Sequence, residues 1–242
     1  MKTALALFAL ALLPGFQDPA AKPDLREEVK ALRAEYQKLE QEYYKQARAA
    51  TTNEERQKLV NPAAEYVGKY QALAERAKGT PAAADALIEV FALAQRTQKK
   101  AEARQAVETL VADHLDSPVM ERLANSLRYA DNLIGKDLCR TTLDAIREKS
   151  PVPAAKAAAI FVGAAQNLGR DAEASRTAFL RIIKEFKETP YAARADKFLF
   201  EIDHLQVGMT APDFEATDEK GLKYKLSDFR GKVTVIDFWG FW

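Results

Sequence analysis

Four Ser-Pro or Thr-Pro dipeptides, spaced regularly through the middle of the chain, constrain its fold most strongly. They are Thr80-Pro81, Ser117-Pro118, Ser150-Pro151 and Thr189-Pro190. Each predicts a helix start, with proline at the first helical position and the hydroxyl capping free backbone N–H groups. Successive prolines are 37, 33 and 39 residues apart (118 − 81, 151 − 118 and 190 − 151). Periods of this size indicate repeated pairs of helices.

The sequence between these prolines is consistent with stacked helical hairpins. Gly135-Lys136 and Gly169-Arg170 supply turns inside two of the hairpins. Each hairpin has an apolar face that it cannot bury alone, so we expect neighbouring hairpins to stack into one core. The residues of these faces include Leu87, Val90, Phe91, Ala94, Phe179, Ile182, Ile183 and Phe186.

Residues 79–205 resemble tetratricopeptide-type repeats, and residues 186–193 are the closest local match. The early tryptophan of that consensus is missing and the period varies. The resemblance implies a concave surface that binds a peptide or partner protein. The alternative is a spacer or scaffold, which the sequence supports about equally well.

A highly charged region, residues 24–78, precedes the repeats. Its first helix carries apolar residues at heptad spacing: Leu25, Val29, Leu32, Tyr36, Leu39 and Tyr43. Both a coiled-coil dimer and a long helix packed on its own domain fit this stripe. We favour the packed helix, because three heptads are barely enough to hold a free coiled coil. Residues 51–55 and Asn61-Pro62 predict turns that lead into new helices.

The first 17 residues have the pattern of a secretory signal peptide. Lys2 precedes an apolar run at residues 4–13, which is too short to span a bilayer, and Pro14-Gly15 follows. A buried N-terminal helix is the weaker alternative, because a polar chain follows at once. Cleavage after Gln17 would leave 225 residues (242 − 17). We expect a periplasmic or cell-envelope protein with no transmembrane span after signal removal and no lipid-anchoring cysteine.

Charge and cysteine content narrow the possible partners. The 36 Lys and Arg residues balance 35 Asp and Glu residues, so nonspecific binding of nucleic acid has no electrostatic basis. The single Cys139 excludes an internal disulfide, and with the separated His114 and His204 it does not suggest a zinc site. We expect no metal and no cofactor. Cys139 is interpreted as a buried packing residue, His114 as lying near a helix C-terminus, and His204 as lying in the last turn of the final helix.

After the last predicted helix the pattern changes to strands and turns. Residues 214–217 and 222–226 predict two strands around a turn at 218–221, and residues 227–232 predict a short helical turn or loop. Residues 233–239 form a nearly continuous apolar run. Such a run is typical of a central strand buried on both faces of an α/β sheet.

Three pieces of this region, residues 208–214, 226–232 and 235–242, carry a family resemblance when taken together. Residues 206–242, about the last sixth of the chain, resemble the start of a redoxin domain of the alkyl hydroperoxide reductase and thiol-specific antioxidant branch of the thioredoxin superfamily. The aromatic-tryptophan pair that ends the predicted strand, Phe238-Trp239, is more similar to exported thiol-disulfide oxidoreductases than to true peroxidases. Phe241 stands at a position where this family usually has Ser or Thr. The motif residues beside the expected site are Pro212, Asp213, Phe214, Phe238, Trp239, Gly240, Phe241 and Trp242.

The resemblance implies that the nucleophilic cysteine of a Cys-x-x-Cys pair comes immediately after Trp242. No catalytic residue is therefore expected within the 242 residues, and the chain as given should be inactive. A UGA codon for selenocysteine at that position is one hypothesis. A frameshift, a sequencing error or a nonsense mutation are the alternatives.

The sequence therefore predicts a mostly α fold: helical-hairpin repeats followed by an incomplete thioredoxin-like α/β segment. The sequence favours the interpretation that this chain is the N-terminal part of an exported thiol-disulfide oxidoreductase or antioxidant redoxin. The complete protein would act in cell redox homeostasis, with a disulfide-containing protein or a peroxide as its substrate. The helical repeats would bind its partner. The alternative is a non-enzymatic periplasmic helical-repeat binding or scaffold protein with a vestigial redoxin tail.

Overall fold

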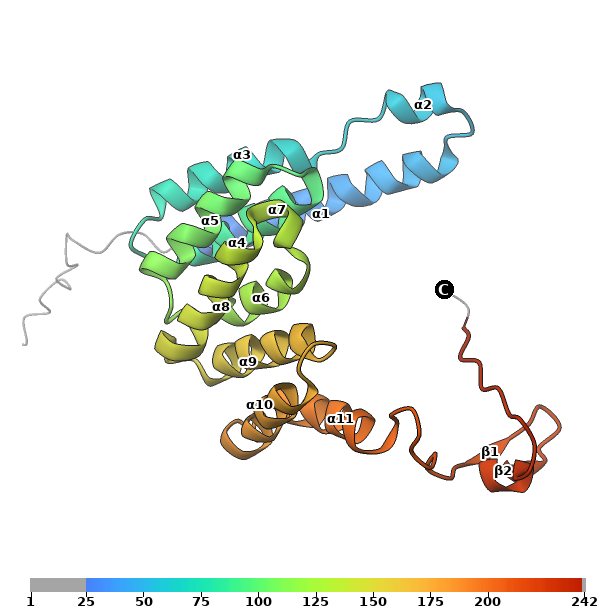
Figure 1. Cartoon of the computed structure of the whole chain (residues 1–242). Helices are drawn as coiled ribbons and strands as arrows, with labels where there is room; N and C mark the ends of the chain where they lie inside the picture. The colour runs from blue at the N-terminus through green and yellow to red at the C-terminus, as the bar shows by residue number, and fades with distance from the viewer. Residues whose placement is uncertain (1–24, 241–242) are drawn as a thin grey trace, which may run out of the picture.

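The computed structural model describes residues 25–240, and this part of the chain is mostly helical, as predicted (Figure 1). The predicted signal peptide, Phe241 and Trp242 lie outside the described residues. The α-helices are α1 Arg26–Ala49, α2 Asn53–Gln57, α3 Ala63–Arg76, α4 Pro81–Thr97, α5 Lys100–Asp113, α6 Val119–Ser126, α7 Asp131–Ile134, α8 Lys136–Lys149, α9 Pro153–Asn167, α10 Ala172–Glu185 and α11 Pro190–His204. Short 3-10 helices are η1 Leu127–Tyr129 and η2 Leu226–Phe229, and the strands are β1 Glu215–Thr217 and β2 Lys223–Lys225.

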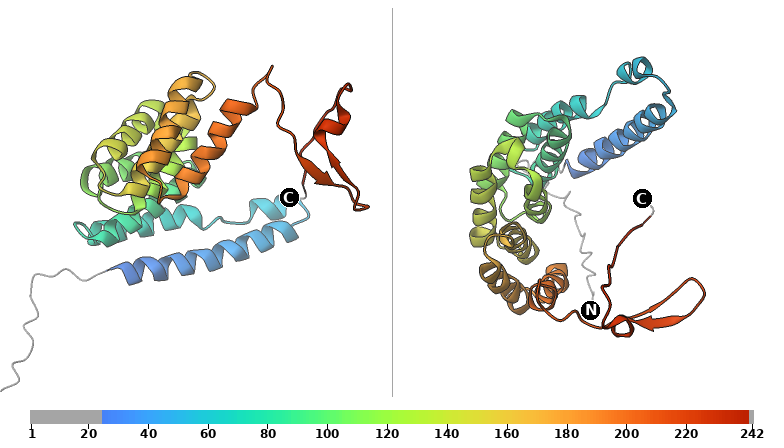
Figure 2. Two further views of the ribbon diagram at one scale, coloured as in Figure 1. Left: turned by 90° about the horizontal axis from the view of Figure 1, so that it is seen from below. Right: turned by 45° about the vertical axis from the view of Figure 1, so that its right-hand side comes forward.

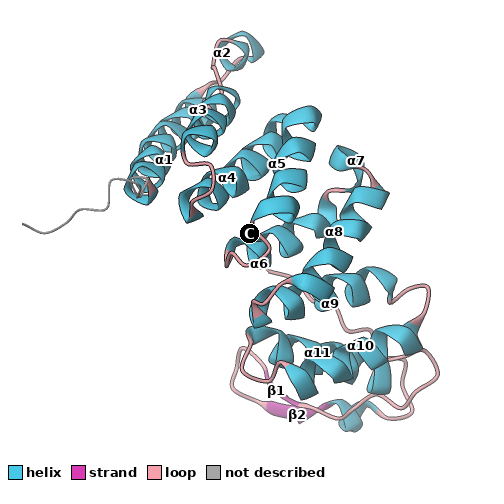
Figure 3. Ribbon diagram, turned by 90° about the vertical axis from the view of Figure 1, so that its left-hand side faces the viewer, coloured by secondary structure: helices cyan, strands magenta, loops and turns pink. Residues whose placement is uncertain are grey.

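The helices from α3 to α11 form a stack in which most contacts join near neighbours in the sequence. α4 packs between α3 and α5, and α9 packs against α6, α8, α10 and α11. Figure 3 shows α8, α9 and α10 side by side, and the right-hand view of Figure 2 shows the helices following a curved path. The β1–β2 hairpin lies beyond the end of α11, away from most of the helices (Figure 1).

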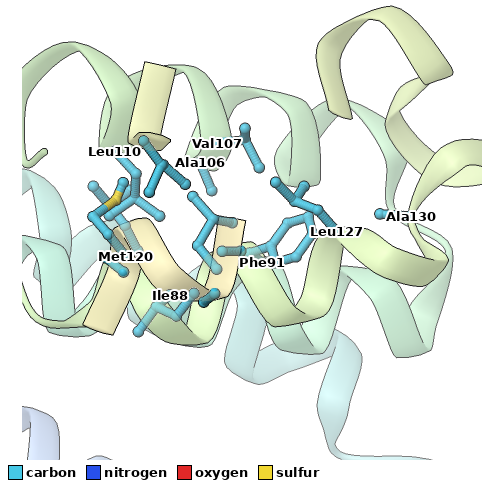
Figure 4. Packing of buried hydrophobic residues seen from close by; sticks show 14 of the residues in the cluster. Ile88, Phe91, Ala106, Val107, Leu110, Met120, Leu127 and Ala130 are labelled. Carbon is cyan, nitrogen blue, oxygen red and sulfur yellow. The ribbon is translucent and has the colours of Figure 1, made fainter. Parts of the chain in front are cut away.

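The core runs through the two most deeply buried helices, α4 and α9. Both are rich in alanine, and the small side chains let neighbouring helices approach closely. Figure 4 shows Phe91 of α4 beside Leu127 of η1, and Leu110 of α5 beside Met120 of α6. The predicted burial of the apolar faces is confirmed: Phe91, Phe179 and Ile182 are fully buried, and the others are buried or packed against the core.

The Ser/Thr-Pro dipeptides mark three of the four helix starts correctly. Pro81 and Pro190 are the first residues of α4 and α11, and Pro118 directly precedes α6. The prediction for Pro151 is wrong, because α9 begins at Pro153. Val152 precedes that second proline and is therefore held in an extended conformation, with ψ of 112°, since a following proline disfavours the helical region.

The predicted capping role of the threonine hydroxyls is also wrong. Thr80 Oγ1 donates a hydrogen bond to the Ala77 carbonyl oxygen at 2.7 Å, and Thr189 Oγ1 donates to that of Phe186 at 2.7 Å. Ala77 and Phe186 are the C-terminal caps of α3 and α10. Each threonine hydroxyl therefore donates to the same carbonyl as its own backbone N–H, at the end of the preceding helix, and does not accept from an N–H of the next helix.

The first half of α1 packs on the helical stack, which confirms the packed-helix interpretation for that half. Val29 and Tyr36 are buried, whereas Leu39 is 44% exposed. Glu89 of α4, itself buried, joins α1 to α6 because it accepts hydrogen bonds from Arg33 at 2.7 Å and from Arg122. α1 is thus part of the folded body through its buried N-terminal half, and Glu40 and Tyr44 of its second half also contact Arg96 of α4.

The predicted starts of α2 and α3 are confirmed. Thr52 and Glu55 form a capping box at the start of α2. Asn61 Oδ1 accepts a hydrogen bond from the backbone N–H of Ala63, the first residue of α3, at 2.9 Å. Among residues 25–240, no helix combines the length and the hydropathy needed to cross a membrane.

The C-terminal segment contains the two predicted strands but lacks the third. β1 and β2 pair antiparallel, with Ala216 opposite Tyr224, and they form the only sheet of the described residues. The prediction of a buried strand at residues 233–239 is wrong: this stretch has no strand assignment, and Val233 is 98% exposed. A central strand needs neighbours on both edges, and residues 25–240 provide it with none.

Candidate functional site

Two sequence motifs of the C-terminal segment, residues 208–214 and 226–232, are joined through Asp213. Its Oδ1 accepts a hydrogen bond from the backbone N–H of Ser227 at 2.8 Å, and its Oδ2 accepts one from Ser227 Oγ at 2.8 Å. These two bonds hold the pKa of the Asp213 carboxyl below its usual value. The N–H of Leu226 also donates to the Phe214 carbonyl oxygen at 3.1 Å.

The β1–β2 hairpin between these motifs has a well-defined turn. Asp218 Oδ1 accepts hydrogen bonds from the backbone N–H groups of Lys220, at 2.9 Å, and Leu222, at 2.8 Å. Gly221 takes the left-handed conformation, with φ of 84°, which a side chain would disfavour. Lys223 of β2 forms an ion pair with Glu215 of β1 at 3.0 Å. The hairpin is therefore an ordered connection between the two joined motifs.

The third motif does not form a compact unit with the first two. Phe238 is 92% exposed and Trp239 is 75% exposed, and Gly240 is the last described residue. Figure 1 shows this end of the chain running away from the hairpin. The structure therefore joins Asp213 to Ser227 and Phe214 to Leu226, with Pro212 next to them in the chain, and leaves Phe238 and Trp239 largely exposed.

Cys139 has the properties of a packing residue. It lies on α8, is 3% exposed and forms no disulfide. Burial, and secondarily a hydrogen bond with Asp131, raises the pKa of its thiol to about 12. The nucleophile in thiol chemistry is the thiolate, so Cys139 is poorly suited to react at neutral pH.

The two histidines lie where the sequence predicted and do not meet. His114 is the buried C-terminal cap of α5, and His204 is the exposed last residue of α11, with its ring 4.9 Å from that of Phe200. No group of three or more His, Cys, Asp or Glu residues in the described part of the chain could hold a metal ion.

A second candidate site, which the sequence reasoning missed, is a groove of about 960 Å³ between α8 and α10, with α9 as its floor. We call it the basic groove. Its charged lining consists of six cations, Arg128, Lys136, Arg140, Arg147, Arg170 and Arg181, and three carboxylates, Asp131, Asp137 and Asp144. The helical spacing of Lys136, Arg140 and Arg147 was a usable signal, because residues four and seven apart share one helix face.

Comparison with known proteins relates the chain to thiol-disulfide oxidoreductases of the thioredoxin-like kind. No protein-family model matches the chain, and no solved structure matches it significantly. Thiol-disulfide oxidoreductase ResA of Geobacillus kaustophilus (strain HTA426) is 51% identical over 45 residues, which are 19% of this chain and 26% of that protein. ResA of Geobacillus thermodenitrificans (strain NG80-2) is 44% identical over 45 residues, with the same coverage of each chain. ResA of Bacillus thuringiensis subsp. konkukian (strain 97-27) is 42% identical over 40 residues, 16% of this chain and 23% of the relative.

The chain spans about a quarter of the length of these curated relatives. Over that length the similarity supports a function related to redox chemistry.

Proposed function

We propose that residues 206–242 are the N-terminal part of a thioredoxin-like domain that exchanges thiols and disulfides, and that the protein is exported. The observation that carries this proposal is the 51% identity to a thiol-disulfide oxidoreductase over 45 residues. We infer that the matched stretch is the C-terminal segment, because the redoxin-like motifs lie there. An antioxidant role, with peroxide as the oxidant, is the variant of this function that the same motifs allow.

The geometry of the C-terminal segment supports the proposal. Asp213 and Ser227 come from two separate motifs of the resemblance, and they are joined by two hydrogen bonds. Motif residues that make a specific contact have a structural reason to occur together. The exposed apolar run that follows, with Val235 86% exposed, suits a strand that pairs with further strands of a complete sheet.

The proposed chemistry is thiol-disulfide exchange. A thiolate attacks one sulfur of the substrate disulfide, a mixed disulfide forms, and the other substrate sulfur leaves as a thiolate. A second thiol then attacks the mixed disulfide, so that the substrate is reduced to two thiols and the enzyme is oxidised to a disulfide. Cys139 is the one thiol within these 242 residues, and it is buried with a raised pKa. On the resemblance of residues 206–242 to redoxins, we place the nucleophile, Cys or selenocysteine, directly after Trp242.

An insulin-reduction assay, in which a small dithiol regenerates the reduced enzyme, tests this proposal. The protein is expressed from the gene together with the coding sequence after codon 242. Three forms are compared: the unchanged protein, a variant with serine at the position after Trp242, and the Cys139→Ala variant. Turnover should disappear with the serine and persist in the Cys139→Ala control. A folded product without turnover, or turnover by residues 1–242 that requires Cys139, would overturn the proposal.

We further propose that residues 79–205 form a tetratricopeptide-like module that binds a protein partner or peptide. The helices bury their own core, centred on α4 and α9, without a contribution from the C-terminal segment. This observation also favours the second candidate function, a non-enzymatic binding or scaffold protein. The insulin assay on the product of the longer coding sequence separates the two, because a non-enzymatic protein would show no turnover there, whereas partner binding should survive deletion of residues 206–242 under either function.

A further inference from the structure

We propose that the basic groove binds an acidic, extended segment of a partner polypeptide. This inference deepens the proposed partner-binding role of the helices and rests on it, but it does not rest on the redox chemistry. The groove has an excess of three positive charges, six cations against three carboxylates. The whole chain has a formal net charge of only +1. The positive charge is therefore concentrated in the groove instead of reflecting a generally basic protein, and such a patch attracts ligands of opposite charge.

Two of the groove cations are both unpaired and exposed, whereas Arg128, which also lacks an ion pair with any described residue, is partly buried and lies over the Tyr129 ring. Lys136 and Arg170 form no ion pair or side-chain hydrogen bond with any described residue, and both are exposed. Arg147 and Arg181 already have acidic partners, Asp144 at 2.9 Å and Glu185 at 2.8 Å. Because Lys136 begins α8 and Arg170 precedes α10, the two available cations come from opposite walls of the groove.

The floor of the groove is apolar and suited to small side chains. Ile160 and Ala164 of α9 and Leu143 of α8 line it, each 5–7% exposed. A Cβ placed on Gly163 would meet no atom within 4 Å, so the backbone of a ligand has room to come close there. In an extended peptide alternate side chains point to opposite sides. A peptide with acidic residues at alternate positions can therefore present carboxylates to the cations and small apolar groups to the floor.

The carboxylates of the groove favour a peptide over a nucleic acid or an anionic membrane. Asp137 is exposed in the α8 wall, and Asp144 is partly exposed about two turns further along the helix. These carboxylates pair with Arg140 and Arg147 and interrupt the row of cations on α8, so a continuous row of phosphates finds no matching row of positive charge. A peptide can avoid the carboxylates or place a neutral or basic residue opposite them.

Binding of synthetic peptides to the full chain tests the inference. The probe is a short peptide in which Asp alternates with Ala, and the comparison peptide has Asn in place of Asp. Affinity is measured by fluorescence anisotropy at low salt for the wild type and for the double variant Lys136→Glu, Arg170→Glu. The double variant should bind the acidic peptide at least about tenfold more weakly, because two attractive charges become repulsive. Added salt should weaken wild-type binding.

The matched control is the double variant Lys38→Glu, Lys197→Glu, which makes the same change in net charge at exposed residues of α1 and α11, outside the groove. It should bind within about twofold of the wild type. Equal loss in both double variants, equal affinity for the Asn peptide, or tighter binding to phosphatidylglycerol vesicles or DNA than to the acidic peptide would overturn the proposal. Circular dichroism confirms that each variant is folded. If the unchanged protein expressed with the coding sequence after codon 242 binds the peptide but does not reduce insulin, the redox proposal alone is refuted.

Discussion

Replacement of Phe161 by alanine should remove a large part of the stability of the helical stack. Phe161 lies on α9 and is 1% exposed. Its ring centroid lies 5.7 Å from that of Phe179, 5.8 Å from that of Tyr191 and 5.3 Å from that of Phe198. The Arg194 guanidinium lies 4.2 Å above the same ring. One side chain thus joins α9 to α10 and α11.

We expect Phe161→Ala to lower the free energy of unfolding by about 3–5 kcal/mol, the range for a buried Phe replaced by Ala. The upper half of that range is expected, because three aromatic contacts, each worth about 0.5–1.5 kcal/mol beyond area burial, are lost together. Phe161→Leu fills more of the cavity and should cost less. The assay is urea unfolding followed by helical circular dichroism, with the free energy taken from the midpoint and slope.

Phe200→Ala is the matched control on α11, because Phe200 is 48% exposed. It should change the free energy of unfolding by no more than about 0.5 kcal/mol. A loss below about 1 kcal/mol for Phe161→Ala, or equal losses for the two alanine variants, would refute the packing described for α9, α10 and α11.

Three further predictions concern polar groups. Glu89→Ala leaves its two arginine partners uncompensated and should cost about 1–3 kcal/mol in the same unfolding assay, with Glu89→Gln intermediate; no cost would contradict the described cluster. Asp213 has a folded-state pKa below its unfolded value of about 3.9. Its contact with Ser227 should therefore stabilise the segment above that value and be lost as the pH falls through the folded-state pKa. An NMR titration of the Ser227 amide should show this midpoint, which Asp213→Asn abolishes, and a midpoint at or above 3.9 would be contrary evidence. The Cys139 thiol should react slowly with Ellman's reagent in the native protein at neutral pH and much faster in urea, and fast native labelling would disprove its burial.

Much of the helical architecture could be predicted from the sequence because its signals are local. Proline at the first helical position and apolar residues at helical spacing depend on nearby residues alone, and they identified α4 and α11 correctly. Pro151 failed as a helix start because Pro153 competes with it through the conformation of Val152. The Thr80 and Thr189 hydroxyls failed as caps because carbonyls of the preceding helices lie within reach.

The candidate sites were less predictable because they depend on contacts between distant residues. The motifs identified the region of Asp213 and Ser227, but not the hydrogen bonds between these residues, which are 14 positions apart. The basic groove gathers its cations from several elements, so the spacing of Lys136, Arg140 and Arg147 could indicate one wall of it but not the whole groove. The strand prediction for residues 233–239 failed for a related reason, since a nearly continuous apolar run is buried as a strand only between neighbouring strands, which residues 25–240 do not supply.

The central claim is that the C-terminal segment begins a thioredoxin-like redox domain, and the coding sequence after codon 242 tests it most directly. The account predicts an open frame whose first codon is a cysteine codon or a UGA read as selenocysteine, followed by a second cysteine three positions later and the remaining strands and helices of such a domain. A stop at UAA or UAG, or a following sequence without that cysteine spacing, would contradict it.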